Sequence, residues 1–167
     1  MRIKSIYPII TMKNTKMDKN DIKLLRSLRE SGRQSWLELS EKVSLSASAC
    51  QRRVQTLLDK GIIKRFSVVV DEQAMGYSIK AFVNVKVQRQ DTKSANDFKN
   101  RIKDQNEVQA CHMLSGDIDF LLEVVATDLS AFTKFMEEKL LSSSAVKDAT
   151  SSIVLQVIKT HKNALPS

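Results

Sequence analysis

The residues best suited to chemistry gather in one short segment, SASACQRRVQTLLDKG, at positions 46–61. On a helical wheel at about 100° per residue, its apolar residues fall on one face and its serines, glutamines and arginines mostly on the other. The donors and acceptors of these polar side chains match base edges and phosphates. A helix that only had to be soluble would more often carry Glu and Lys paired four residues apart. The segment therefore predicts a helix with a surface for nucleic acid.

The position of each polar residue predicts how the contacts divide. We expect base contacts from the first half of this helix, the half that would reach into a major groove, and phosphate contacts from the residues around it. The expected base contacts are Ser48, Gln51, Arg52 and Gln55. The expected phosphate contacts are Arg53, Lys60, Lys64, Arg65 and the segment around Gln34 and Ser35. Ser46, at the start of the helix, completes the expected DNA-binding set.

A second candidate site is the segment SGDID at 115–119. Gly116 allows a tight turn that brings backbone N–H groups close to a ligand. Such amides suit a carboxylate, and a nearby Asp117 or Asp119 suits an ammonium, so the segment with Ser115 could hold the backbone of an amino acid. The residues alone favour an ordinary hairpin turn over this site. Further candidates to line the same cavity are Thr150, Ser151 and Ser152.

The charge of the chain is unevenly distributed. Residues 1–66 hold 15 Lys/Arg and 6 Asp/Glu, whereas residues 67–167 hold 12 and 13, for a net charge of +8. This asymmetry indicates a basic module for a polyanion joined to a neutral module with another task. The opening residues 1–16 are interpreted as a disordered tail or an over-long start.

Composition also disfavours several classes of protein. The sequence has two histidines, two cysteines, and neither a GxSxG nor a P-loop motif, so we expect no enzyme and no cofactor. Cys111 beside His112 provides too few ligands for a metal. The cysteines form no disulfide framework and fit a reducing cytoplasm. No apolar run approaches the ~20 residues of a membrane span.

Three helices should position the first site. Residues 18–30 have Ile22, Leu25 and Leu28 on one face, with Leu24 beside them. Ser35 and Glu38 form a capping box that opens the second helix, in which Trp36, Leu39 and Val43 make a narrow apolar stripe. Ser46 can cap the third helix, and Gly61 follows its end. Two short helices joined by about three residues, the second polar and basic outside, predict a helix-turn-helix.

The rest of the chain predicts a small sheet. Residues 62–70 are strand-like and lead into a hinge. The expected elements that follow are strand 79–88, helix 92–105, strands 108–115 and 118–126, a helix capped by Asp128, and strand 149–159. This βαββαβ order predicts an α+β domain, a four-stranded antiparallel sheet with two helices on one face. On the open face, Phe82, Val154 and Ile158 predict an apolar patch that a second copy would cover.

Three segments resemble the Lrp/AsnC family of transcriptional regulators in order and spacing: MDKNDIKLLRSL, LSEKVSLSASACQRRVQTLLDKGIIK and HMLSGDIDFLLEV. The resemblance runs from about Met17 to the C-terminus. It implies a ferredoxin-like, RAM-type second domain that senses amino acids, dimers assembled further into tetramers or octamers, and an effector-response motif at Gly116, Asp117 and Asp119. Many family members have glycine where this chain has Ser44, and prolines at positions 47 and 49.

The expected organisation is a helix-turn-helix domain at 17–63, a linker strand and hinge at 64–77, an effector-sensing and oligomerisation domain at 78–159, and a tail at 160–167. The leading hypothesis is a cytoplasmic, sequence-specific transcriptional regulator that binds double-stranded DNA, responds to an amino acid, and has no contact with a membrane. The alternative is a nucleoid-type architectural protein that coats DNA with weak sequence preference.

Overall fold

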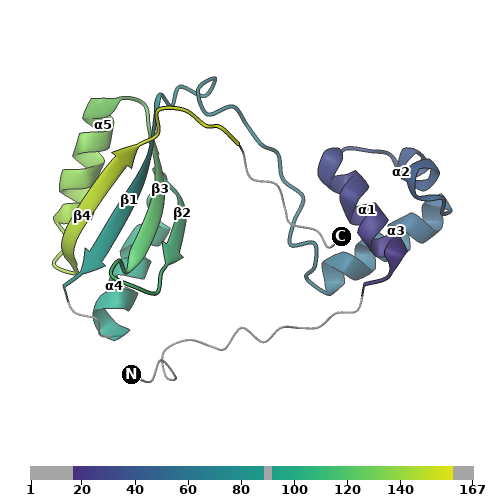
Figure 1. Cartoon of the computed structure of the whole chain (residues 1–167), viewed down its shortest axis with the longest axis horizontal. Coiled ribbons are helices and arrows are strands. Elements are labelled where there is room, and N and C mark those ends of the chain that lie inside the picture. Colours follow the sequence, from purple (N-terminus) through teal and green to yellow (C-terminus); the bar gives the residue numbers. More distant parts are fainter. Residues whose placement is uncertain (1–16, 89–91, 160–167) are drawn as a thin grey trace. The chain divides into compact units, whose positions relative to one another are not determined.

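The computed structural model describes residues 17–88 and 92–159, which divide into two units with the boundary along the chain between residues 69 and 70 (Figure 1). The tails expected at 1–16 and 160–167 lie outside the described residues. No helix in the described part of the chain is long and apolar enough to cross a membrane.

Three short helices form the first unit, and each begins directly after a capping side chain. They are α1 (Lys19–Glu30), α2 (Trp36–Val43) and α3 (Ala47–Asp59). Asp18, Ser35 and Ser46 each accept a hydrogen bond from the backbone N–H three residues later, because the first turn of a helix leaves its N–H groups without partners. Only residues 44–46 separate α2 from α3, so the predicted helix-turn-helix is confirmed.

The apolar faces of the three helices meet in one small core. Its buried members are Leu24, Leu39, Val43, Cys50 and Val54. The predicted inner face of α3 is confirmed, and desolvation raises the pKa of the Cys50 thiol. Trp36 departs from its predicted stripe, because its side chain is 40% exposed.

The buried face of α1 centres on Leu24 and Ser27, whereas the predicted Ile22, Leu25 and Leu28 are half-buried. Ser27 can be buried because Gln34 satisfies its polar groups. Its hydroxyl donates to Gln34 Oε1 at 3.1 Å, and Gln34 Nε2 donates to the Ser27 carbonyl at 2.8 Å. Gln34 thus fastens the loop after α1 to that helix.

The turn between α2 and α3 has a left-handed residue. Ser44 has φ +57° and ψ +48°, a conformation that costs a residue with a Cβ about 1–2 kcal/mol. Glycine would avoid that cost, because it has no Cβ. Ser44 is therefore a local source of strain in the helix-turn-helix.

The second unit is a four-stranded antiparallel sheet in the order β2-β3-β1-β4, with its helices on one side (Figure 1). Its strands are β1 (Ile79–Val87), β2 (Val108–Met113), β3 (Phe120–Ala126) and β4 (Val146–Ile153). Its helices are α4 (Thr92–Lys103) and α5 (Leu129–Lys134), which continues as the π-helical segment η1 (Phe135–Leu141). The predicted βαββαβ order is confirmed.

Alternation along β1 separates the two faces of this sheet. Ala81, Val83, Val85 and Val87 are buried against the helices, where they meet Phe98 of α4 and Phe135 of η1. Lys80, Phe82, Asn84 and Lys86 lie on the opposite face, as predicted, because successive side chains of a strand point to opposite sides.

Two strand predictions were wrong. β4 spans Val146–Ile153, not 149–159. It ends there because its partner β1 has few residues left: Ile153 is opposite Ala81, and the Val154 N–H donates to the Lys80 carbonyl at 2.8 Å. Beyond that bond Ile158 is exposed and lies outside the strand, so it does not join the Phe82 face as predicted.

The strand predicted at 62–70 is also absent from the described structure. Residues 64–70 have no regular secondary structure, and Val69 is 99% exposed. A strand exists only where a second strand bonds its N–H and C=O groups. β-branched residues favour the extended backbone, but among the described residues nothing pairs with them there.

Replacing Ser44 by glycine should stabilise the first unit. We expect Ser44→Gly to raise its free energy of unfolding by about 1 kcal/mol, because glycine adopts a positive φ without the Cβ penalty. Trp36 is the single tryptophan of the chain, so its fluorescence in a denaturant titration reports this unit. Glu41→Gly, in the exposed interior of α2, is the matched control and should lower stability by about 1 kcal/mol. A Ser44→Gly variant that is no more stable than the natural chain would show that the turn is unstrained.

Candidate nucleic-acid interface and ligand loop

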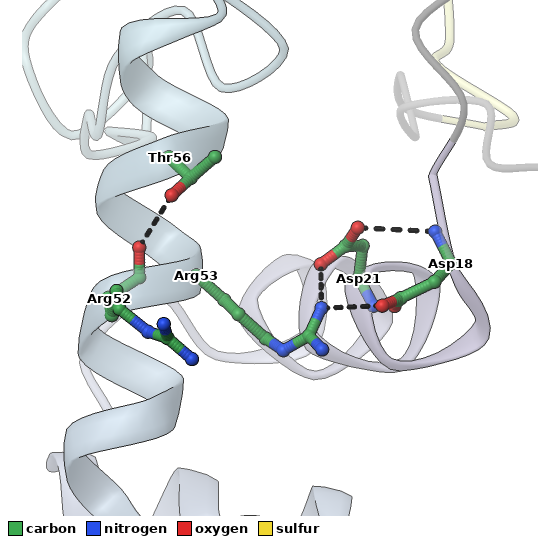
Figure 2. A network of polar contacts seen from close by, with 5 residues as sticks. All are labelled: Asp18, Asp21, Arg52, Arg53 and Thr56. Carbon is green, nitrogen blue, oxygen red and sulfur yellow. Dashed lines mark hydrogen bonds and ion pairs between the residues drawn. The ribbon is translucent and has the colours of Figure 1, made fainter.

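The outer face of α3 carries the predicted base-contacting side chains. Ser48, Gln51, Arg52 and Gln55 are all exposed. Gln55 Nε2 donates to Asp59 Oδ1 at 2.8 Å, so this amide is held along the helix. The Arg52 guanidinium bonds to no described residue, whereas its backbone carbonyl accepts from the Thr56 hydroxyl at 2.9 Å (Figure 2). The face therefore presents a guanidinium without a partner in the described part of the chain, among hydroxyl and amide groups.

Two predicted DNA-binding serines also cap helices. Ser35 accepts from the Glu38 N–H at 3.2 Å, while Glu38 Oε2 accepts from the Ser35 N–H at 2.7 Å and from its hydroxyl at 2.8 Å. These bonds hold the pKa of Glu38 below its usual range. The Ser46 hydroxyl accepts from the Ala49 N–H at 3.2 Å and lies 3.2 Å from the Ser48 hydroxyl. Both capping serines are nevertheless exposed at the start of their helices.

Arg53 has partners that the sequence prediction did not include. Its Nη1 lies 2.7 Å from Asp18 Oδ2 and 2.8 Å from Asp21 Oδ1, and its side chain is 29% exposed. The two carboxylates raise the pKa of Arg53 further above its usual value. The pKa of Asp18 is lowered by the hydrogen bond from the Asp21 N–H and by Arg53. Figure 2 shows the Arg53 side chain reaching from α3 to the start of α1.

The side-chain amide of Gln34 likewise forms hydrogen bonds within the protein. Besides its bonds to Ser27, its Nε2 donates to the Ser31 carbonyl at 2.6 Å and its Oε1 accepts from Lys42 Nζ at 2.6 Å. The amide is thereby committed to the loop between α1 and α2.

A polar hollow of about 270 Å³ lies beside Arg53. Its lining residues come from the start of α1, from α3 and from the turn after it: Met17, Asp21, Arg52, Arg53, Thr56, Leu57, Lys60 and Ile62. Arg52 and Lys60, both predicted to contact DNA, therefore share one concave surface. No sequence pattern predicted this hollow, because α1 and α3 come together only in the folded unit.

The predicted ligand loop joins β2 to β3. Gly116 has φ +136°, a region open essentially only to glycine, and Ser115 and Asp117 are exposed beside it. Asp119 ends the loop and fastens it to β1: its Oδ2 accepts from the Val87 N–H at 2.9 Å, and its own N–H donates to the Val85 carbonyl at 3.1 Å. One Asp119 oxygen thus already has a backbone partner.

Thr150 and Ser152 lie on the other side of β1 from this loop. In the sheet register Thr150 is opposite Asn84, and Ser152 is opposite Phe82. β1 separates β4 from β3, so about 10 Å, two strand spacings, separates the strand of these hydroxyls from β3, which begins directly after Asp119. Within one chain, the six predicted effector residues therefore form two groups instead of one.

The open face of the sheet carries the predicted exposed aromatic. Phe82 is 39% exposed and lies between Glu123 of β3 and Ser152 of β4. Beside it, Lys80 Nζ contacts Glu123 Oε1 at 2.6 Å and Glu72 Oε2 at 3.3 Å. These carboxylates, Glu123 first, raise the pKa of Lys80. The face therefore has an exposed aromatic side chain beside an ion-paired lysine.

No metal centre accompanies these sites: across residues 17–88 and 92–159, no three His, Cys, Asp or Glu side chains gather as metal ligands would. Cys111 is a free, exposed thiol on β2. Neighbouring His112 points to the opposite face of the strand, because side chains alternate there.

Two family models match the chain, one for each unit. A model described as a winged helix-turn-helix DNA-binding domain matches residues 17–64. A model described as the Lrp/AsnC ligand binding domain matches residues 80–164.

Characterised relatives match over nearly the whole chain. The proline dehydrogenase transcriptional activator of Rhizobium radiobacter is 35% identical over 147 residues, which cover 88% of this chain and 94% of that protein. The leucine-responsive regulatory protein of Escherichia coli K12 is 32% identical over 143 residues, 86% of this chain and 87% of that protein.

A solved structure has the same fold. The transcriptional regulator of Neisseria meningitidis in complex with L-Met superimposes with a TM-score of 0.85 at 39% identity, covering 90% of this chain and 97% of that one. These matches agree with the helix-turn-helix and with the antiparallel sheet described above. The chain therefore belongs to the Lrp/AsnC family of transcriptional regulators, with an N-terminal DNA-binding domain and a C-terminal ligand-binding domain.

Proposed function

We propose that α3 reads DNA sequence in the major groove through Ser48, Gln51, Arg52 and Gln55. The observation that supports this most is the guanidinium of Arg52, which bonds to no residue that the structure describes and lies on an exposed face of hydroxyls and amides. A guanidinium suits the two acceptors of guanine, and an amide suits adenine. Lys60, with the basic residues that follow α3, would contact phosphates and set the register of the domain. Residues 17–63 form the DNA-binding domain in this proposal.

An architectural role on DNA is the second candidate. The excess positive charge in residues 1–66 would support binding to phosphates without regard to sequence. The two roles differ in their response to sequence: a regulator loses affinity when its operator is scrambled, whereas a coating protein does not. Because the proposed partner is DNA, we assign the protein a regulatory and not an enzymatic role. We place this role in the cytoplasm.

Changing Arg52 should separate base contacts from phosphate contacts. We expect Arg52→Ala to weaken binding to the best site by about 1–3 kcal/mol and to leave nonspecific binding nearly unchanged. Lys60→Ala is the matched control, because losing a phosphate contact should weaken both kinds of binding and lower the salt dependence by about one unit of slope. Titrations of a specific and a scrambled duplex measure both effects. Equal losses on the two duplexes for Arg52→Ala would make it a phosphate contact.

The ligand loop would hold an amino acid. Backbone N–H groups of residues 115–117 suit its carboxylate, and the Asp119 oxygen that does not bond Val87 suits its ammonium. The L-Met complex of the Neisseria meningitidis regulator supports an amino acid as the class of effector. Thr150 and Ser152, which lie across β1 from Asp119, would contribute to the site from a neighbouring copy. Residues 78–159 are the effector-sensing domain in this proposal.

Self-association would connect ligand binding to DNA binding. The exposed Phe82 and the unpaired, β-branched residues 68–70 are surfaces that a second copy of the chain can cover. A two-fold dimer would present two copies of α3 to two half-sites, and tetramers or octamers would extend this arrangement. The amino acid then acts by binding one assembly better than another, with a coupling of about 1–3 kcal/mol.

Two changes at Asp119 separate its charge from its hydrogen bond. Asp119→Asn keeps an oxygen that can accept from the Val87 N–H, so the sheet should stay intact while the ammonium loses its counter-charge. We expect this variant, like Asp119→Ala, to lose the thermal shift caused by the effector found among the twenty amino acids; a ligand at 100 times its dissociation constant adds about 2.7 kcal/mol. DNA binding without ligand should persist. A normal shift in Asp119→Asn would remove Asp119 from the ammonium site.

Changing Phe82 tests self-association. We expect Phe82→Glu to lower the mass of the assembly in sedimentation experiments, because a carboxylate cannot be buried there without a partner. Leu129→Glu is the matched control: Leu129 is also exposed but belongs to α5 on the helical side of the sheet. If the two variants sediment like the natural chain, the Phe82 face is not the interface between copies.

A further inference from the structure

Arg53 closes a small network in which every carboxylate oxygen has one task. Asp18 Oδ1 accepts from the Asp21 N–H at 2.8 Å, and Asp21 Oδ2 accepts from the Asp18 N–H at 3.2 Å, which is the capping box of α1. The two oxygens left over, Asp18 Oδ2 and Asp21 Oδ1, both bind Nη1 of Arg53 (Figure 2). The capping box thus holds both carboxylates in place through bonds that do not involve Arg53.

This network joins segments that are distant in the sequence. Arg53 lies 35 residues after Asp18 and 32 after Asp21. The apolar cluster shared by α1 and α3 is small: Leu24 and the partly buried Leu28 come from α1, and Cys50, Val54 and the partly buried Leu58 come from α3. Such a small core limits how firmly packing alone can set the rotation of α3 about its own axis. The ion pairs of Arg53 with Asp18 and Asp21, at the flank of the helix, restrain that rotation without burying more apolar surface.

Arg52 and Arg53 are neighbours with opposite situations. Arg53 is held at one flank of α3. Arg52 precedes it in the sequence and lies about 100° away around the helix axis, and its guanidinium bonds to no described residue. Fixing one side chain therefore fixes the direction in which the other points. Recognition groups have to be held within about 0.5 Å of their working geometry by residues around them.

The charge around Arg53 disfavours the binding of a phosphate there. The two carboxylates and one guanidinium carry a net charge of −1 between them, so the positive charge of Arg53 is already more than balanced locally. A phosphate would have to displace at least one carboxylate that the capping box holds. Arg52 and Lys60 line the same hollow and form no ion pair with a described residue, so they are better placed to meet DNA.

We propose that Arg53 is a positioning residue: its bond to Asp18 and Asp21 fixes the rotation of α3 against α1, so that the outer face of α3 meets base edges, and Arg53 itself contacts no phosphate. This inference rests on the proposed reading of DNA sequence by α3. It replaces the phosphate contact that the sequence suggested for Arg53.

Salt dependence distinguishes positioning from contact. Binding of the full chain would be titrated against a duplex selected from a random pool by the natural protein, and against a scrambled duplex of equal composition, over a series of KCl concentrations. For Arg53→Gln we expect an affinity loss of about tenfold on the selected duplex, the size of one lost base contact. The affinity for the scrambled duplex and the slope of log affinity against log salt should not change. Lys60→Gln, the matched control, should lower both affinities and reduce the slope by about one.

The acidic partners give a test of opposite sign. Asp18→Asn combined with Asp21→Asn removes both charges, yet asparagine is itself a good N-cap, so α1 stays capped. If Arg53 positions α3, this double variant loses preference for the selected duplex, because Arg53 has lost its anchor. If Arg53 is a phosphate contact that the acids restrain, affinity for both duplexes rises and the slope grows by about one.

Trp36 fluorescence verifies that each variant is folded at the temperature of the titration. Arg53→Lys, whose single nitrogen can replace Nη1 between the carboxylates, should restore the preference for the selected duplex. A reduced slope in Arg53→Gln, an unchanged preference in both kinds of variant, or a gain of affinity in the double variant would overturn the positioning role. A natural chain that binds the two duplexes equally would instead overturn the proposed sequence reading.

Discussion

The binding surface of the first unit depends on how the apolar face of α3 is buried. Cys50, Val54 and Leu57 have almost no exposed surface, and burying them against α1 and α2 leaves the opposite side of the helix in water. The exposure of Ser48, Arg52 and Gln55 follows from that burial, because a helix with one buried stripe presents its other residues outward. The hydrophobic effect thus decides which side of α3 faces water, although the residues of that side are polar.

The same constraint acts in the second unit with a different result. A sheet covered by helices on one side only has an uncovered second side, and Phe82 is exposed there among polar neighbours. On the helical side, Phe98, Phe120 and Phe135 are buried in the core between sheet and helices. A monomer therefore buries one face of its sheet and exposes an aromatic side chain on the other, and this asymmetry is the physical reason for the proposed link between ligand binding and assembly.

Polar side chains in this protein often have a structural task at a place where their chemistry suggests binding. Arg53 joins α3 to the cap of α1, Gln34 fastens a loop, and Asp119 ties the ligand loop to β1. In each case the residue type suits a ligand, and its observed partner is the protein itself. A small unit with a short core gains definition from such contacts, because buried apolar area alone is limited at this size.

Much of this architecture could be predicted from the sequence. Periodicity and capping residues depend on neighbours a few positions away, so the helix-turn-helix, the βαββαβ order and the buried faces of α3 and β1 were predicted correctly. Contacts between distant segments could not be predicted, because local patterns do not encode them. The link from Arg53 to Asp18, the hollow beside it, the end of β4 and the separation of Thr150 from Asp119 arose only when the helices and strands packed together. Residue types and spacing determined which chemistry was available, and the tertiary structure decided which side chains were free to use it.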